Sequence, residues 1–346
     1  MIQIHVLPFG KGECFMLVFQ GSSEREAHIM VIDSGYVRTA QRFKAKLQGL
    51  MEQYGGSIWM LLTHIDQDHI GGYRYLFQNP GFREYDRITG FYYNTVASLQ
   101  KLEPGITSEL VNGMDSIPTS TETSAVDAVT LEALLEEKGT RVHTDLQAGG
   151  EEISLADGIR MKILSPSPAS LSKYRDWLDN QEDLKTAAEA DDYRKPLEEL
   201  WKAAFSSDPS AVNASSLSVL ISAYGRTLLF LGDSLAGDVA ASLRTLGYSE
   251  DAPLKADVVK LAHHGSRHNT NSKLLRLIQG KYFLFSGEGG RGCPDKETLA
   301  RVVRYQENPV FWFAYDLADR IFTLDEREKY HIQAECATEW RLDEDA

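Results

Sequence analysis

Cysteines are few in this sequence and long apolar runs are missing, and both features exclude classes of protein. The three cysteines have no paired spacing: Cys14, Cys293 and Cys336. We therefore expect a reducing compartment and no disulfide framework. No apolar run approaches the roughly 20 residues of a membrane-spanning helix. Residues 1–19 predict two strands around a glycine turn rather than a signal peptide. A soluble cytoplasmic protein without a membrane partner is expected.

Basic residues are also in deficit. The 346-residue chain has 36 Lys and Arg against 50 Asp and Glu, a formal net charge of −14. This balance argues against a broad nonspecific nucleic-acid surface, because contacts to phosphate groups need Lys and Arg. A nuclease is not excluded, since two bound cations would neutralise much of the charge at the site itself. Hydrophobic residues make up 42% of the chain, which is enough for a sizeable core.

The segment THIDQDHIGG at residues 63–72 carries the strongest chemical signal. It follows the apolar run at residues 58–62, which predicts a buried strand. It holds four side chains of the metal-ligand type: His64, Asp66, Asp68 and His69. Imidazole and carboxylate together suit zinc, manganese or iron. A solvated polar loop is the alternative, and four such side chains directly after a strand argue against it.

The spacing of these four side chains predicts two metal ions. Residues two apart in an extended turn point the same way, so His64 and Asp66 can share one ion. Asp68 and His69 are adjacent and diverge, which lets them reach a second ion. Two ions about 3.5–4 Å apart can bridge and activate one hydroxide.

Two later strand ends carry further ligand-type side chains. Asp233 follows the apolar strand predicted at 227–231; it is either the N-cap of the next helix or, together with the first motif, a bridging metal ligand. His263 and His264 follow the strand predicted at 257–262. We expect one of them to bind the second metal and prefer His264, although the sequence does not decide between them. His268 faces either substrate or solvent.

The remaining chain predicts strands and helices without a short repeat. Further strands are expected at 2–7, 15–19, 28–32, 86–93, 152–155, 160–164, 217–223, 282–286, 310–315 and 320–324. Helices are expected at 39–54, 126–138, 170–205, 235–246, 271–278 and 295–306. The segment at about 170–210 is acidic. It is either an amphipathic insertion packed on the main domain, or a lid or a docking surface for a basic protein partner.

Five segments in order resemble the metallo-β-lactamase superfamily, and most specifically the soluble hydrolase domain of the competence protein ComEC and its stand-alone relatives. They are IHVLPFGKGECFMLV, VIDSG, LTHIDQDHIGG, NASSLSVLI with LLFLGD, and DVVKLAHHGS. A weaker segment, LFSGEGGRGCPDKETL, extends the resemblance to about residue 299. Glu13 stands at the acidic position of the family's glycine-rich first turn. Residues at about 95–140 and 170–210 fall outside the resemblance and are interpreted as insertions in a single domain, 1–346.

The resemblance implies a fold of the α/β (α+β) class, an αββα sandwich of two mixed β-sheets flanked by helices. It also assigns roles to matching positions. His64 and Asp66 would bind the first of two divalent ions, and Asp68, His69 and His264 would bind the second. Asp233 would bridge both ions, and Asp33 would steady the histidine loop. Asp68 and Asp233 are thus the expected catalytic carboxylates.

Three departures from the superfamily pattern change the expected chemistry. Asp66 replaces the common histidine, and Asn213 with Ser216 occupies the region where many members have a further histidine. The first site is therefore rich in oxygen ligands, which makes manganese a candidate beside zinc. Cys293 precedes Pro294 where the branch often has His-Pro, and it either faces the site or is a small core residue.

The leading hypothesis is a dinuclear metal-dependent hydrolase, a phosphodiesterase or nuclease that uses a metal-bridging hydroxide on a nucleic acid or nucleotide. Asn213, Ser266 and His268 are expected to position the substrate. One alternative is hydrolysis of a small ester, lactone or thioester; another is a weakly active interaction subunit of a larger defence or regulatory complex. A basic strip near the site would favour nucleic acid, and its candidates are Lys260, Arg267, Lys273, Arg276 and Arg291.

Overall fold

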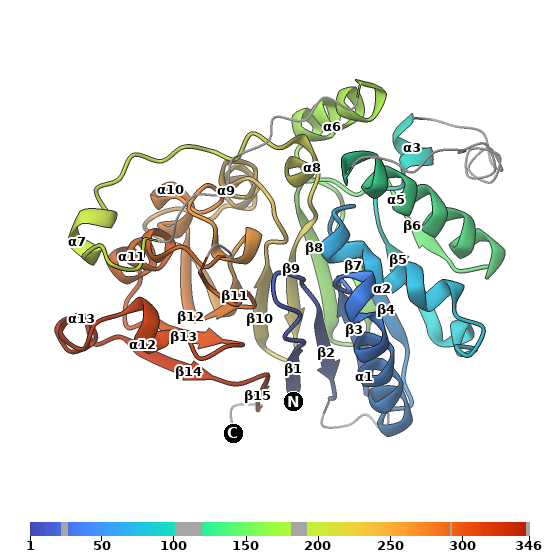
Figure 1. Cartoon of the computed structure of the whole chain (residues 1–346), viewed down its shortest axis with the longest axis horizontal. Coiled ribbons are helices and arrows are strands. Elements are labelled where there is room, and N and C mark those ends of the chain that lie inside the picture. Colours follow the sequence, from blue (N-terminus) through green and yellow to red (C-terminus); the bar gives the residue numbers. More distant parts are fainter. Residues whose placement is uncertain (22–26, 101–119, 181–191, 291–292, 344–346) are drawn as a thin grey trace. The chain divides into compact units, whose positions relative to one another are not determined.

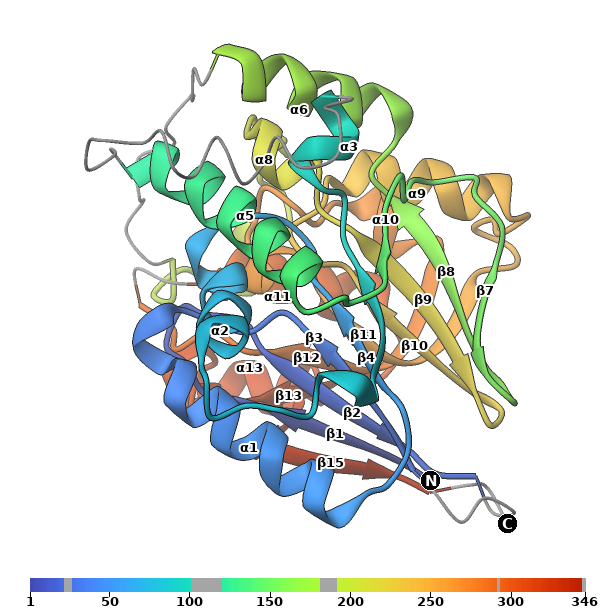
Figure 2. The ribbon, with the colours of Figure 1, turned by 90° about the vertical axis from the view of Figure 1, so that its right-hand side faces the viewer.

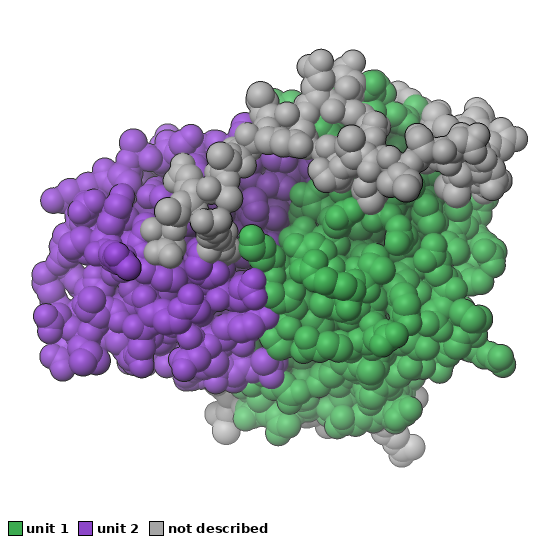
Figure 3. Space-filling view, viewed as in Figure 1, with its two compact units in different colours: residues 1–146, 171–183, 339–346 green, residues 147–170, 184–338 purple. Residues whose placement is uncertain are grey.

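A computed structural model describes residues 1–21, 27–100, 120–180, 192–290 and 293–343. The chain divides into two compact units, coloured separately in Figure 3. Unit 1 comprises Met1–Leu146, Leu171–Asp183 and Glu339–Ala346, and unit 2 comprises Gln147–Ser170 and Leu184–Thr338. The single domain expected over 1–346 stays a prediction. Parts of both expected insertions, residues 101–119 and 181–191, lie outside the described residues.

Unit 1 is built on a seven-stranded sheet in the order β15-β1-β2-β3-β4-β5-β6. Its strands are β1 (Ile2–Val6), β2 (Phe15–Phe19), β3 (His28–Ile32), β4 (Ile58–Leu61), β5 (Ile88–Tyr92), β6 (Val142–His143) and β15 (Glu339–Leu342). Its helices are α1 (Ala40–Gln53), α2 (Gln67–Gln78), α3 (Val96–Gln100) and α5 (Ser120–Glu137), with short 3-10 turns η1 (Val37–Thr39) and η2 (Tyr85–Arg87). Figures 1 and 2 show α1, α2 and α5 along one face of this sheet.

The strands of unit 1 follow from uninterrupted apolar runs. Every residue of β2 and β4 is buried, which is typical of strands covered on both faces. Pairing is antiparallel from β15 to β3 and parallel from β3 to β6, so the sheet is mixed. On α1 the apolar stripe Phe43, Leu47, Leu50 and Met51 is buried, as its helical spacing predicts.

Unit 2 is built on an eight-stranded mixed sheet in the order β14-β13-β12-β11-β10-β9-β8-β7. Its strands are β7 (Ile153–Ala156), β8 (Ile159–Ser165), β9 (Ser218–Ala223), β10 (Arg226–Phe230), β11 (Leu254–Lys260), β12 (Ile278–Phe285), β13 (Val310–Phe313) and β14 (Gln333–Cys336). Its helices are α7 (Leu197–Leu200), α8 (Ala211–Ala214), α9 (Ala236–Thr245), α10 (Ser272–Leu275), α11 (Lys296–Tyr305), α12 (Ala318–Ile321) and α13 (Leu324–Lys329), with the turn η3 (His263–Gly265). Helix α6 (Pro168–Asn180) begins in unit 2 and ends in unit 1.

The core of unit 2 joins its sheet to α9, α10 and α11, through residues such as Val239, Leu274 and Leu299 packed with Phe283 and Phe311. Strands β7 to β10 pair antiparallel and β10 to β14 pair parallel. The chain therefore holds two mixed β-sheets flanked by helices, and this part of the predicted fold class is confirmed. Among the residues that the structure describes, no helix is both long and apolar enough to span a bilayer.

Two predicted elements are wrong. Residues 320–324 are not a strand: α12 ends at Ile321, and Thr323 caps α13 in a reciprocal capping box with Glu326. The expected helix over 170–205 is interrupted, because residues 192–196 form a turn and only Leu197–Leu200 is helical between there and residue 205. Pro196 explains this interruption, since it disfavours helical backbone at the residue before it and removes a backbone donor.

Candidate metal centre

In unit 1 two neighbouring parallel strands, β3 and β4, end in residues of the candidate metal centre. Ile32 at the end of β3 pairs with Leu61 at the end of β4, so Asp33 and the loop that begins at Leu62 leave the sheet at the same edge. The Asp33 N–H donates to the Leu61 carbonyl at 2.9 Å. The carboxyl ends of parallel strands are where α/β sheets gather polar side chains for binding.

Asp33 fixes the ring of His69. Its Oδ1 accepts the Thr63 N–H at 2.8 Å, and its Oδ2 accepts the Thr63 hydroxyl at 2.8 Å. The same Oδ2 lies 2.7 Å from His69 Nδ1, and both residues are fully buried. An ionised carboxylate is an acceptor only, so the ring donates from Nδ1, which is the tautomer that a histidine needs in order to bind a cation through Nε2. The role that the resemblance implied for Asp33 fits this geometry.

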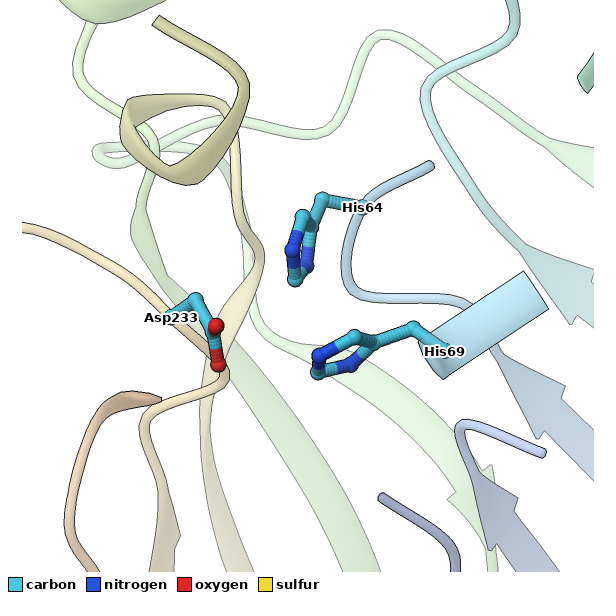
Figure 4. Close-up of side chains that lie close together, drawn as sticks. All are labelled: His64, His69 and Asp233. Carbon is cyan, nitrogen blue, oxygen red and sulfur yellow. The ribbon is translucent and has the colours of Figure 1, made fainter. Parts of the chain in front are cut away.

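The two pairs expected from the spacing are each brought together within unit 1. His64 Nε2 lies 3.5 Å from Asp66 Oδ2, and His69 Nε2 lies 3.7 Å from Asp68 Oδ2. The two rings have centroids 4.1 Å apart, and Figure 4 shows one above the other. Asp66 occupies the N-cap position of α2, so Asp68 and His69 fall in the first helical turn. That these four side chains bind metal stays a prediction.

The glycine pair of the motif has a packing role. A Cβ at Gly71 would lie 2.3 Å from the Val37 nitrogen, and one at Gly72 would lie 2.3 Å from the Ser34 carbonyl oxygen. Glycine therefore lets α2 pack directly on the main chain that follows Asp33. Ser34 secures this contact, because its hydroxyl donates to the His69 carbonyl at 2.7 Å and accepts the Tyr73 N–H at 2.8 Å.

Glu13 belongs to the same neighbourhood. It is 1% exposed, its N–H donates to the Asp68 carbonyl at 3.0 Å, and its carbonyl accepts the Gly35 N–H at 2.8 Å. Ligand atoms of Glu13, Asp33 and His69 all lie within 4.8 Å of one another. The sequence showed Glu13 only as a motif position, and the structure places its carboxylate beside the candidate ligands.

The substitution Asp33→Asn is expected to lower the affinity of the chain for zinc or manganese about 10–100-fold, because outer partners of ligating histidines have effects of this size. The measurement is a metal titration of the variant against wild type. Asp86→Asn, in the turn η2, is the matched control and should bind as wild type does. Equal affinity in Asp33→Asn would show that the Asp33–His69 contact has no part in metal binding.

In unit 2 two neighbouring parallel strands, β10 and β11, are also followed by residues of the candidate metal centre. Phe230 of β10 pairs with Lys260 of β11, and Asp233 and His263 follow these strands by three residues each. The His263 N–H donates to the Gly232 carbonyl at 2.8 Å. Asp233, labelled in Figure 4, is 2% exposed, and its N–H donates to Ser216 Oγ at 2.9 Å. Ser216, a candidate either to contact substrate or to support the metal ligands, is fully buried and holds the main chain of Asp233.

The segment from His263 to Gly265 has left-handed backbone throughout, with φ of 49°, 54° and 90°. This conformation costs an L-residue roughly 1–2 kcal/mol, and such strain is often found at functional sites. His264 is 7% exposed, whereas the His263 side chain is 35% exposed and its Nε2 lies 3.7 Å from Asp233 Oδ2. The choice between the two histidines as ligand stays open.

Sequence reasoning missed Asp208, Asn269 and Thr63. Asp208 is buried, which opposes its ionisation, but hydrogen bonds with His263 and Asn213 outweigh burial and lower its pKa. A local signal existed: Asp208 precedes a proline and accepts the Ser210 N–H at 2.9 Å, an Asx turn. The contacts that join it to His263 and Asn269 span 55 and 61 residues, so no local pattern could reveal them.

The other predicted positions in unit 2 have mixed outcomes. Ser266 is buried and its Oγ accepts the His268 N–H at 3.2 Å, while His268 Nδ1 lies 2.9 Å from the Ser206 carbonyl. Burial, followed by the charges of Asp295 and Asp233, raises the pKa of the Cys293 thiol well above its usual value. Whether Cys293 faces the site or is a small core residue stays a prediction.

Of the basic residues expected to form a strip near the site, one is buried and two are paired with carboxylates. Lys260 is 1% exposed and its Nζ lies 3.3 Å from the Gly232 carbonyl. Arg267 is paired with Asp295 at 2.8 Å, and Arg276 with Glu250 at 3.3 Å. Lys273 is exposed on α10, and Arg291 lies outside the described residues.

Comparisons with known proteins give fold-level likeness only. No family model matches the chain, and no curated protein matches it. Zn(2+)-bound PqqB from Methylobacterium extorquens is 13% identical over 98% of this chain and 100% of that chain, with a TM-score of 0.42. The metallo-β-lactamase fold protein YhfI from Bacillus subtilis is 10% identical over 98% of each chain, with a TM-score of 0.41. A long form RNase Z from yeast is 12% identical over 91% of this chain and 37% of that chain, with a TM-score of 0.40. Because these scores are low, we infer a function from the residues themselves.

Proposed function

We propose that this chain is a dinuclear metal-dependent hydrolase that cleaves phosphodiesters, with zinc or manganese as its metal. The observation that carries the proposal is the buried pair of rings at His64 and His69. Each ring has a carboxylate within 4 Å of its Nε2, and Asp33 holds His69 from behind. Imidazole nitrogens and carboxylate oxygens are a donor set that fits either metal.

The assignment of ligands follows the order of the motifs along the chain. His64 and Asp66 would hold the first ion, Asp68 and His69 would hold the second with His264, and Asp233 would bridge them. Asp33 and Glu13 support the first motif by the contacts described above, and Ser216 supports Asp233. The resemblance to the ComEC hydrolase domain is the reason to combine the two motif groups in one site.

Two bound divalent ions would lower the pKa of water and neutralise charge on a phosphodiester. The chain's own residues perform the positioning. Asp33 keeps the His69 proton on Nδ1, and Asn213 is held by its 2.8 Å bond to Asp208, which leaves its amide oxygen to face a substrate. Asn213, Ser266 and His268 remain the proposed substrate-positioning group.

The burial and ion pairing of the basic residues favour a small substrate over a long polymer. Lys260 is buried and Arg267 is ion-paired, so neither offers a charge to a long phosphate backbone. We therefore favour a nucleotide-sized phosphodiester over long nucleic acid. The same observation keeps a small ester, lactone or thioester as the second candidate, because activated water can also attack a carbonyl carbon.

The test combines elemental analysis with single-turnover assays in added zinc or manganese. Substrates are a chromogenic phosphodiester, a dinucleotide, long DNA and RNA, and a thioester. We expect about two ions per chain and cleavage of the small phosphodiesters, lost in Asp233→Ala and retained in Asp257→Asn, which changes a carboxylate bonded to Arg226. Cleavage of the thioester alone would select the second candidate. No cleavage at all, or cleavage unchanged in Asp233→Ala, would refute the proposal.

A further inference from the structure

Three basic side chains of unit 1 lie around the turn between β1 and β2. Lys11 is exposed in this turn, and Arg38 and Arg42 are exposed in η1 and in the first turn of α1. None of the three has an ion pair with a carboxylate among the residues that the structure describes. By contrast, Lys46 of α1 is paired with Glu339 at 2.7 Å. We call Lys11, Arg38 and Arg42 the basic patch.

Two aromatic rings hold the arginines of the basic patch. The guanidinium carbon of Arg38 lies 3.8 Å from the centroid of the Tyr36 ring, and that of Arg42 lies 5.3 Å from the centroid of the Phe9 ring. Arg42 also donates to the Pro8 carbonyl at 3.3 Å. A guanidinium has five N–H donors, so these contacts leave each arginine with donors for a further partner.

The turn between β1 and β2 joins the basic patch to the candidate metal centre. A Cβ at Gly12 would lie 3.0 Å from a ring carbon of Tyr36 and 3.3 Å from Phe9 Cβ, so both rings meet at this turn. Glu13 is the next residue, and its N–H donates to the Asp68 carbonyl at 3.0 Å. The patch is therefore built on the same turn that contacts the first motif.

The Tyr36 hydroxyl relates the patch to the carboxylates of that motif. Burial, followed by the charge of Asp68, raises the pKa of this hydroxyl to about 12, and the charge of Arg38 opposes the shift. The hydroxyl, the carboxylate and the guanidinium thus lie close enough to interact. The side chains of Asp66 and Asp68 are 40% and 22% exposed. Bound cations would neutralise these carboxylates, and the basic patch would then attract an anion from solvent.

We propose that the basic patch binds a second phosphate group of the substrate, one that is not cleaved, beside the phosphodiester at the candidate metal centre. Arginine presents a flat fork of donors that matches two phosphate oxygens, and lysine adds a compact charge. Three cations suit one phosphate group, in agreement with a nucleotide-sized substrate. Binding of phosphate by the patch stands alone, and its assignment to the substrate rests on the proposed phosphodiesterase function.

The test is calorimetric titration of the full-length chain, with zinc or manganese added, using dinucleotides whose uncharged methylphosphonate linkage resists hydrolysis. The probes carry a phosphate at the 5′ end, at the 3′ end or at neither end. We expect one phosphorylated probe to bind about tenfold more tightly than the probe without phosphate, the effect of a hydrogen bond to a charged group. Arg38→Gln and Arg42→Gln should each remove most of this preference. Arg83→Gln, an exposed position beyond the carboxyl end of α2, is the control and should retain it.

Equal binding of all the probes would overturn the proposal, and so would a preference that survives in both arginine variants. Both arginines are exposed, and urea denaturation of each variant establishes that it is folded. On a cleavable dinucleotide the same terminal phosphate should lower KM about tenfold in wild type and not in Arg38→Gln, with kcat nearly unchanged. A wild-type KM that ignores the terminal phosphate would overturn its assignment to the substrate. A binding preference in a chain that cleaves no phosphodiester would support the patch and count against the proposed function alone.

Discussion

Alanine at Gly72 is expected to destabilise unit 1 by about 3 kcal/mol or more, the upper end of the range for overpacking a well-packed interior. The new Cβ would lie 2.3 Å from the Ser34 carbonyl oxygen, 2.8 Å from Ser34 Cβ and 3.1 Å from a ring carbon of Phe43. Two of these three atoms belong to the chain directly after Asp33, so relief requires α2 to move away from that segment. Asp68 and His69 would move with the helix, and metal affinity should fall together with stability.

A second helical glycine of unit 1 supplies the matched control. Gly49 lies inside α1, and a Cβ there would meet nothing within 4 Å. Gly49→Ala should therefore stabilise the chain by about 1 kcal/mol, the difference in helix propensity between the two residues. Urea denaturation of both variants, with metal titration of each, is the measurement. Equal effects of the two substitutions would show that the close approach of α2 to Ser34 does not constrain the protein.

The substitution Glu132→Gln is expected to change how stability depends on pH. Glu132 lies on α5 and is 7% exposed. Burial raises its pKa from 4.5 to about 7, although the N–H groups of Val96 and Ala97 and the Tyr93 hydroxyl donate to it and oppose the shift. The folded state thus binds this proton more tightly than the unfolded state. The stabilisation is complete below about pH 4.5 and is lost as the pH rises through about 7.

Glutamine does not titrate, so the Glu132→Gln variant has no such loss of stability as the pH rises. Relative to wild type, Glu132→Gln should gain about 2.5 kcal/mol in free energy of unfolding between about pH 5 and pH 8. Any loss of hydrogen bonds in the variant adds a constant offset and leaves the slope unaffected. Urea denaturation across this range measures the effect, with Glu136→Gln, an exposed position on the same helix, as control. A parallel pH profile for wild type and Glu132→Gln would contradict the raised pKa.

The strands and the first motif could be predicted because their signals are local. Apolar runs such as Phe15–Phe19 are buried along their whole length, and the alternation of His64 with Asp66 describes a turn that the structure contains. Two local signals were overlooked. Thr323 and Glu326 form a capping box, and β15 alternates exposed and buried residues from Glu339 to Leu342. The strand predicted at 320–324 is wrong because the capping box at Thr323 begins a helix there.

The supporting contacts of the candidate site could not be predicted, because they join distant segments. Asp33 meets His69 across 36 residues, and Asp208 meets His263 across 55. The first contact depends on the parallel strands β3 and β4, which end at the same edge of a sheet. The second joins the irregular segment before α8 to the turn after β11, and both arrangements are properties of the whole unit. Burial of Lys260 is a further example, since a lysine at a strand end is usually expected to reach solvent.

Because β15 pairs with β1, the sheet of unit 1 can be completed only late in synthesis. Ile2 lies opposite Leu342, and Ile4 opposite Trp340, so the sheet of unit 1 contains segments made at very different times. Domains generally begin to fold from their amino-terminal end as they emerge. The side of β1 that β15 later covers must stay open while residues up to 338 are added, and an open strand edge is prone to pair with another chain. A chaperone that shields β1 during translation would therefore act on this protein more than on one whose sheet closes early.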